Sequence, residues 1–188
     1  MVTRNESPYG LLRPETLPDA PYAETLVPGL PDREVVTSDL AYAKNHCAAT
    51  AIANLALSFA KRDAHEPLCA TPPDTLRDVY EMVGNGPILF FRRKAERYFH
   101  RHGKSVSLQA VSRRDISAAL RRGNICALLL RDGLFRWHWV LAVGERVYDS
   151  GKKYLRVMDG WHRGHPRYLA IRGCSYIMLA FECTQQKR

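Results

Sequence analysis

The sequence predicts an α+β protein with a mainly antiparallel sheet, because helical patterns fill the first part of the chain and strand patterns fill the second. The chain has 188 residues, of which 46% are hydrophobic and 25% are charged. These values are typical of a globular protein and exclude disorder throughout the chain. A domain of this size buries roughly 70% of the surface that its unfolded chain exposes, which is enough for one substantial core.

Residues 1–37 are expected to form an extended N-terminal arm, and residues 38–188 a single domain. The first segment holds six of the eleven prolines and no periodic apolar pattern. It also lacks the apolar core of a signal peptide, and no segment approaches the ~20 consecutive apolar residues of a membrane span. We therefore expect a cytoplasmic protein without a membrane span, and export by a leaderless route stays open.

Four helices are expected between the arm and Gly123. The first is apolar on nearly every side, which predicts a buried helix. The second follows Asp74 as its N-cap, and the third has a basic face. The fourth begins at Ser112, with Asp115 in a pattern that resembles a capping box, and ends at Gly123. The first three of these helices are expected over residues 48–61, 75–83 and 88–102.

Six strands are expected, one between the third and fourth helices and five after Gly123. Each is a short alternating, β-branched or aromatic run between turn residues. Their ranges are 105–111, 125–130, 137–143, 154–158, 168–171 and 176–181.

The five cysteines do not predict a disulfide framework or a zinc ribbon, since their number is odd and no pair has CxxC spacing. Cys126, Cys174 and Cys183 lie in apolar runs, where a thiol usually behaves as a small buried hydrophobic group. We expect all three to be free and buried. Reduced cysteines favour an intracellular compartment.

Cys47 is the cysteine whose position favours chemistry. It directly precedes the predicted buried helix, and the dipole and free N–H groups of a helix N-terminus lower the pKa of a thiol there. This predicts a nucleophile that iodoacetamide would modify well below pH 8. The alternative is a cysteine that is simply buried.

His138 and Asp159 are the candidate partners of Cys47. His138 lies between Trp137 and Trp139 in a predicted strand, which would hold the imidazole rigidly as a general base. Asp159 follows 21 residues later at the end of the next substantial strand, where it could accept a hydrogen bond from His138 and fix its tautomer. The alternatives are a core histidine and an ordinary Asp-Gly turn.

The segment Asn-His-Cys-Ala-Ala-Thr-Ala at residues 45–51 resembles the nucleophile segment of bacterial papain-like cysteine peptidases. It is most similar to the branch that resembles the double-glycine-leader, bacteriocin-processing peptidases. Residues 116–130, 137–140 and 154–161 resemble the second half of that family, so the resemblance spans about residues 40–162. It implies a papain-like fold in which the nucleophile helix packs on the sheet.

The resemblance also implies roles for individual residues. Cys47 would be the nucleophile, His138 the base and Asp159 the orienting carboxylate. Two positions differ from the family pattern: Ala48 stands where glycine is common, and no glutamine precedes Cys47. Asn45 is therefore the candidate oxyanion donor, together with the backbone N–H of Cys47.

These residues predict a cysteine hydrolase that cleaves a peptide or isopeptide-like amide through an acyl-enzyme. One alternative is a Cys-His-Asp acyltransferase, in which an amine resolves the acyl-enzyme. The other is a non-catalytic binding module, because the chain has a net charge of +9 and a basic stretch at residues 92–104 that includes Tyr98 and Phe99. Together with Arg113, Arg114, Arg121 and Arg122, such a surface could bind phosphates and stack on bases.

We expect a peptide or protein substrate rather than nucleic acid, because no nucleic-acid-binding motif accompanies the basic stretch. A basic rim beside the cleft would select acidic substrates. No cofactor and no metal are expected, since the His/Cys pairs at 162/165, 100/102 and 65/69 each lack the second pair of a zinc site. The oligomeric state stays open.

Overall fold

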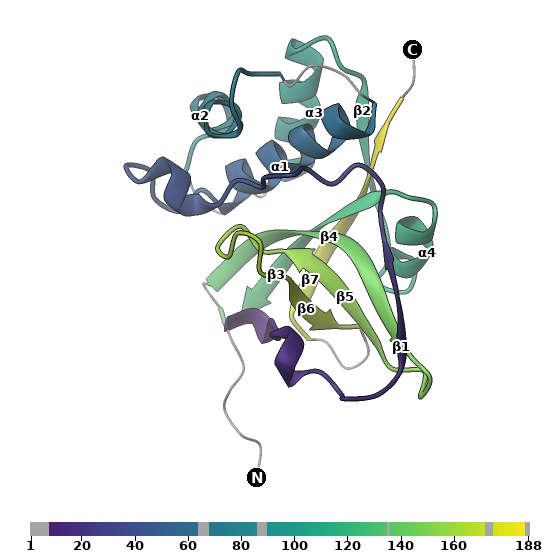
Figure 1. The fold of residues 1–188 in the computed structure, drawn as a ribbon. Coiled ribbons are helices and arrows are strands. Elements are labelled where there is room, and N and C mark those ends of the chain that lie inside the picture. The colour runs from purple at the N-terminus through teal and green to yellow at the C-terminus, as the bar shows by residue number, and fades with distance from the viewer. Residues whose placement is uncertain (1–7, 64–67, 86–89, 135, 172–174, 187–188) are drawn as a thin grey trace.

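The computed structural model describes residues 8–63, 68–85, 90–134, 136–171 and 175–186. It confirms an α+β fold with a mainly antiparallel sheet (Figure 1). Helices α1, α2 and α3 gather on one side of the molecule and most of the sheet lies on the other, with α4 apart from the other helices (Figure 1). No helix among these residues is long and apolar enough to cross a membrane.

The sheet has seven strands, all paired antiparallel, in the order β2-β7-β3-β4-β5-β6, with β1 also paired to β4. The long strand β4 organises it, since its first half pairs with β3 and its second half with β1. The strands are β1 Tyr22–Leu26, β2 Val106–Ala110, β3 Ile125–Asp132, β4 Arg136–Tyr148, β5 Lys153–Met158, β6 Arg167–Ala170 and β7 Ile177–Gln185.

The four predicted helices are present, but the second begins three residues earlier than expected and the fourth begins at Ile116, not at Ser112. The predicted capping box is wrong, because Ser112 donates to the Asp115 carboxylate in the turn before α4. The helices are α1 Cys47–Arg62, α2 Pro72–Val83, α3 Phe91–Arg101 and α4 Ile116–Arg121, and part of the range predicted for the third lies outside the described residues. Thr71, not Asp74, caps α2, because its side chain accepts the Asp74 N–H and Pro72 occupies the first helical turn.

Helix α1 is the buried helix that its composition predicts. Every residue from Ala48 to Phe59 is buried, and the helix packs against β4 and α2. Thr50, Asn54 and Ser58 are the polar residues in this buried stretch, and Asn54 is the one that bonds beyond the helix and its N-cap. Its side-chain amide accepts the Val35 N–H and donates to the Val35 carbonyl, both at 2.8 Å, so it fixes the end of the N-terminal segment to α1.

The described part of the predicted arm packs closely on the domain. It contains the short 3-10 helices η1 Pro8–Gly10 and η2 Pro14–Thr16, and the unpredicted strand β1, which adds to the sheet beside β4. Leu11 is buried, and two backbone hydrogen bonds join Leu12 to Tyr168. A third 3-10 helix, η3 Thr37–Leu40, leads toward α1.

Two of the three predicted core thiols are confirmed. Cys126 on β3 and Cys183 on β7 are both fully buried and free. Cys174 lies outside the described residues.

Candidate active site

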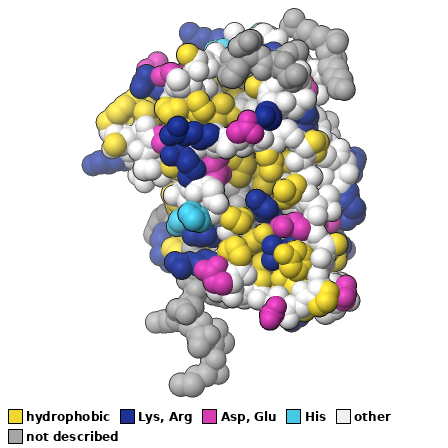
Figure 2. Space-filling view, in the orientation of Figure 1, with side chains coloured by type: hydrophobic (Ala, Val, Ile, Leu, Met, Phe, Trp, Pro, Cys, Tyr) yellow, Lys and Arg dark blue, Asp and Glu magenta, His cyan; other side chains and the backbone are white. Residues whose placement is uncertain are grey.

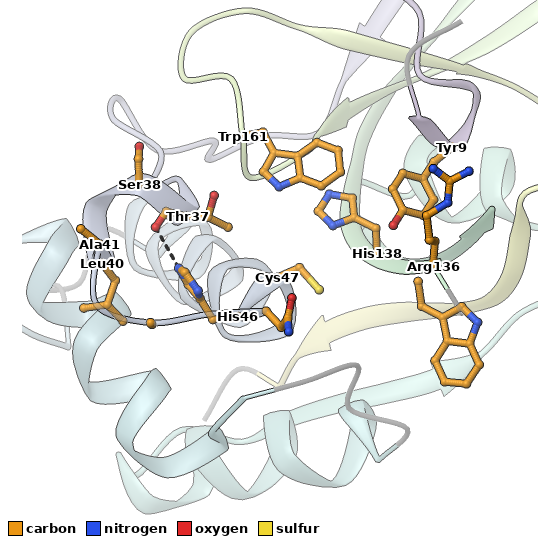
Figure 3. A pocket seen from close by; sticks show the side chains of 13 residues that line it. Tyr9, Thr37, Ser38, Leu40, Ala41, His46, Cys47, Arg136, His138 and Trp161 are labelled. Atoms are coloured by element: carbon orange, nitrogen blue, oxygen red, sulfur yellow. Dashed lines mark hydrogen bonds between the residues drawn. The ribbon is translucent and has the colours of Figure 1, made fainter. Parts of the chain in front are cut away.

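A cleft of about 720 Å³ opens between the beginning of α1 and the beginning of β4 (Figure 3). Its walls come from the N-terminal segment, η3, α1, β4 and the loop after β5. Cys47 and His138 both line it, and Figure 3 shows both side chains directed into the cleft. The lining residues are Tyr9, Thr37, Ser38, Leu40, Ala41, Ala43, Asn45, His46, Cys47, Arg136, Trp137, His138 and Trp161.

Cys47 is the first residue of α1 and is half-buried. Burial raises the pKa of its thiol above the ordinary value, and this effect outweighs the backbone N–H groups of Trp139, Ala48 and Cys47 itself, which lower it. The lowered pKa expected from the sequence is therefore wrong for this state of the protein. The position at the start of a helix predicts a lower pKa, but it says nothing of burial. The cleft walls exclude water from the thiol, and this loss of hydration disfavours the charged thiolate.

His138 is almost completely buried on β4, and its neighbours determine its tautomer. Its Nε2 lies 2.7 Å from the backbone carbonyl oxygen of Asp159. A carbonyl can only accept, so Nε2 carries the proton and Nδ1 has the free lone pair when the ring is neutral. Burial lowers the pKa of His138 to about 4, although the Asp159 carbonyl and carboxylate raise it. His138 is thus a neutral base at neutral pH.

Asp159 orients His138 through its main chain, whereas the sequence predicted a bond from its carboxylate. The carboxylate instead accepts the backbone N–H groups of Trp161 and His162, at 2.9 and 3.0 Å. It also lies 2.6 Å from Nδ1 of His162. Asp159 therefore has both expected roles, but through different groups. Its carboxylate stabilises the turn, and its backbone carbonyl orients His138.

Two aromatic side chains that the sequence analysis missed enclose His138. Trp161 stacks on the imidazole with ring centroids 3.7 Å apart, and the Tyr9 ring lies 5.4 Å away at a tilt of 33°. The position of Trp161 could have been predicted, since it comes directly after the Asp-Gly pair that contains the candidate Asp159. The position of Tyr9 could not, because it lies in the proline-rich segment far from the other residues in the sequence.

Asn45, the candidate oxyanion donor, lines the cleft beside Cys47 and is exposed. Its φ of 53° places it in the left-handed region, which asparagine tolerates better than most residues. This turn directs the chain into the first turn of α1. The amide side chain lines the cleft, two residues before Cys47 in the sequence.

The structure removes the stacking part of the binding-module alternative, although Arg93, Arg97 and Arg101 of the basic stretch are exposed on α3. Tyr98 and Phe99 are buried in the core and cannot stack on bases. Arg121 pairs with Glu145, and Arg122 makes a bidentate contact with Glu182. On the face in Figure 2, Lys and Arg lie in separate groups interspersed with Asp and Glu.

The basic rim expected beside the cleft stays a prediction, and the described lining of the cleft contains one arginine and no lysine. Arg136 is the charged side chain there, and it pairs with Asp132 at 2.7 Å. Across the described ranges, no group of three or more His, Cys, Asp or Glu side chains is arranged to hold a metal ion. Neither a known protein-family model nor a curated protein sequence matches the chain.

Proposed function

We propose that the protein is a cysteine hydrolase that cleaves a peptide or isopeptide-like amide, with Cys47 as nucleophile and His138 as general base. The observation that carries the proposal is the fixed tautomer of His138. Its Nε2–H is engaged by the Asp159 carbonyl, which leaves Nδ1 to accept a proton in the cleft that also contains the Cys47 thiol. A thiol, a base and a group that orients the base are the parts that nucleophilic catalysis needs.

The reaction begins with neutral partners. His138 Nδ1 takes the proton from the Cys47 thiol while the sulfur forms a bond to the substrate carbonyl carbon. The backbone N–H of Cys47 and the side chain of Asn45 stabilise the resulting oxyanion. The C–N bond then breaks, and the imidazolium returns its proton to the departing amine, which leaves a thioester on Cys47.

Water completes the cycle. His138 removes a proton from the water as its oxygen attacks the thioester carbonyl, the C–S bond breaks, and the proton returns to the sulfur. The raised pKa of Cys47 and the lowered pKa of His138 favour this transfer during attack over a preformed ion pair.

The arrangement also supports a papain-like assignment of the fold. The order of the pieces along the chain is nucleophile helix, histidine strand and aspartate loop, and α1 packs directly on β4. In this proposal Trp161 shields the bond between His138 and the Asp159 carbonyl from water, because it stacks on the imidazole.

A library of tetrapeptide aminomethylcoumarin amides tests the proposal. We expect the wild-type protein to release the fluorophore from a subset of the library, and Cys47→Ala to release none. Cys69→Ala is the matched control, since Cys69 is also half-buried but lies outside the cleft. Fluorophore release that survives Cys47→Ala, or no cleavage of any member, would contradict the proposal.

The same assay separates hydrolysis from acyl transfer. Glycinamide added with a cleaved peptide competes with water for the thioester. The free acid as main product supports a hydrolase. A glycinamide adduct that forms at the expense of the acid at low millimolar glycinamide would support an acyltransferase instead.

A further inference from the structure

Tyr9 is held in the cleft by unusual backbone geometry. Its φ of 68° lies in the left-handed region, where a bulky aromatic residue is rare, and Gly10 follows with a φ of 66°. The segment is anchored immediately afterwards by buried Leu11 and by the two hydrogen bonds between Leu12 and Tyr168. Strain that the surrounding structure maintains is often found where a side chain must be positioned for function.

The strained turn places the phenol of Tyr9 beside the proposed reacting groups. Its ring contacts both His138 and Trp161, with centroid distances of 5.4 and 5.9 Å. Figure 3 shows Tyr9 on the same side of the cleft as His138, with its hydroxyl directed into the cleft. Burial and the nearby Cys47 sulfur raise the pKa of this phenol, so it remains neutral during turnover.

The position of Tyr9 determines which part of a substrate it can contact. Asn45 and the first turn of α1 occupy the nucleophile side of the cleft, where the oxyanion would form. The leaving nitrogen must instead lie next to His138, which protonates it. Tyr9 adjoins His138, and no hydrogen bond joins its hydroxyl to another residue in the described part of the chain.

We propose that Tyr9 is a substrate-contacting residue on the leaving-group side, whose hydroxyl oxygen accepts the N–H of the scissile amide. This inference rests on the proposed function and deepens it. The bond would direct the nitrogen lone pair toward His138, so that the proton arrives as the C–N bond breaks. Through Tyr9, the N-terminal segment would then take part in catalysis.

The test compares two leaving groups on one acyl group. The best tetrapeptide from the coumarin library is prepared as the aminomethylcoumarin amide and as the p-nitrophenyl ester. The ester has no N–H and its leaving group departs without protonation. Tyr9→Phe keeps the ring and removes only the hydroxyl, and Tyr22→Phe removes a phenol hydroxyl from the exposed end of β1 as a matched control.

We expect Tyr9→Phe to lower kcat/KM for the amide by about 10- to 100-fold, because the variant loses one well-oriented hydrogen bond in the transition state. For the ester, kcat/KM should fall by less than about 2-fold. Tyr22→Phe should change neither rate, and both variants should keep the wild-type Tm. A merely structural role for Tyr9 would slow both substrates together.

Other results would overturn the inference. Equal slowing of amide and ester, or no slowing of either, removes Tyr9 from the leaving-group side but leaves the hydrolase proposal intact. If the wild-type protein cleaves neither substrate, the proposed function fails and this inference fails with it.

Discussion

Asp159 illustrates how one residue can serve the site through two different groups. Its carbonyl fixes the tautomer of His138, and its carboxylate fixes the loop that carries Trp161 over the same imidazole. A substitution that changes only the carboxylate should therefore act mainly on the loop. The direct effect of the carboxylate on His138 is limited to its charge, which raises the pKa of the imidazole, because no hydrogen bond joins the two side chains.

This division predicts different effects for two substitutions at residue 159. Asp159→Asn keeps an oxygen for the two backbone N–H groups and should lower kcat by less than about 10-fold. Asp159→Ala removes all the bonds that this side chain makes to the loop and should lower kcat by about 10- to 100-fold, with a reduced Tm. If Asp159→Asn is as damaging as His138→Asn in the same amide-cleavage assay, the carboxylate acts on the imidazole after all.

The thiol of Cys47 gives a second prediction at the scale of the residue. Because burial raises the pKa of Cys47 and keeps His138 neutral, its alkylation by iodoacetamide should increase with pH beyond about 8.5, the ordinary thiol value. Peptide mapping by mass spectrometry measures the rate at Cys47 separately from the other cysteines. A rate already at its plateau near pH 6 would reveal a thiolate–imidazolium pair and contradict the neutral resting state.

At the scale of elements, the sequence predicts what is periodic and misses what depends on distant packing. Helix α1 and strands β3 to β7 carry clear apolar patterns, so their positions follow from the sequence. Strand β1 has the pattern of a solvated edge, since four of its five residues are exposed, and only pairing with β4 makes it a strand.

The same division applies to the candidate site. Cys47 and His138 lie at an element boundary and within an apolar strand, where local signals exist. Tyr9 enters the cleft only because the N-terminal segment folds back across the sheet, and short-range patterns contain no information on such a contact. The atom by which Asp159 contacts His138 also depends on the loop conformation, not on residue type.

Gly144 tests how firmly the N-terminal segment is attached. It lies on β4 opposite Leu26, and a Cβ at this position would come within 2.4 Å of the backbone oxygen of Thr25. Gly144→Ala should therefore separate β1 from β4 and lower the free energy of unfolding by about 1–3 kcal/mol. Urea denaturation measures the loss.

Thr25→Ala is the control for that experiment, since it alters an exposed side chain and leaves the backbone oxygen in place. It should change stability by less than about 0.5 kcal/mol. Equal stability of Gly144→Ala and the wild-type protein would show that the β1–β4 pairing is loose.

At the scale of the whole molecule, the cleft lies where α1 meets the sheet, so the groups proposed to react belong to the same core that stabilises the fold. The proposed base, His138, therefore also affects the stability of the fold in acid. The pKa of His138 is about 4 in the folded protein and 6.5 when unperturbed, so the unfolded chain binds the extra proton first as the pH falls.

The stability that His138 contributes is therefore fully present above pH 6.5 and is lost as the pH falls toward 4. The expected loss is roughly 3 kcal/mol, measured as the difference in unfolding free energy between wild type and His138→Asn at each pH. As the pH falls, the wild type should lose more of its unfolding free energy than the variant. A difference that stays constant from pH 7 to pH 4 would show that the imidazole is hydrated and not buried as described.

The central claim is that Cys47, activated by His138, attacks a carbonyl carbon and carries the acyl group. The most direct measurement is intact-protein mass spectrometry after rapid acid quenching during turnover of the p-nitrophenyl tetrapeptide ester. We predict a mass increase equal to the acyl group, mapped to Cys47, that is absent from Cys47→Ala and strongly reduced in His138→Asn. An acyl group on another residue, or equal acylation of His138→Asn and the wild-type protein, would contradict the account.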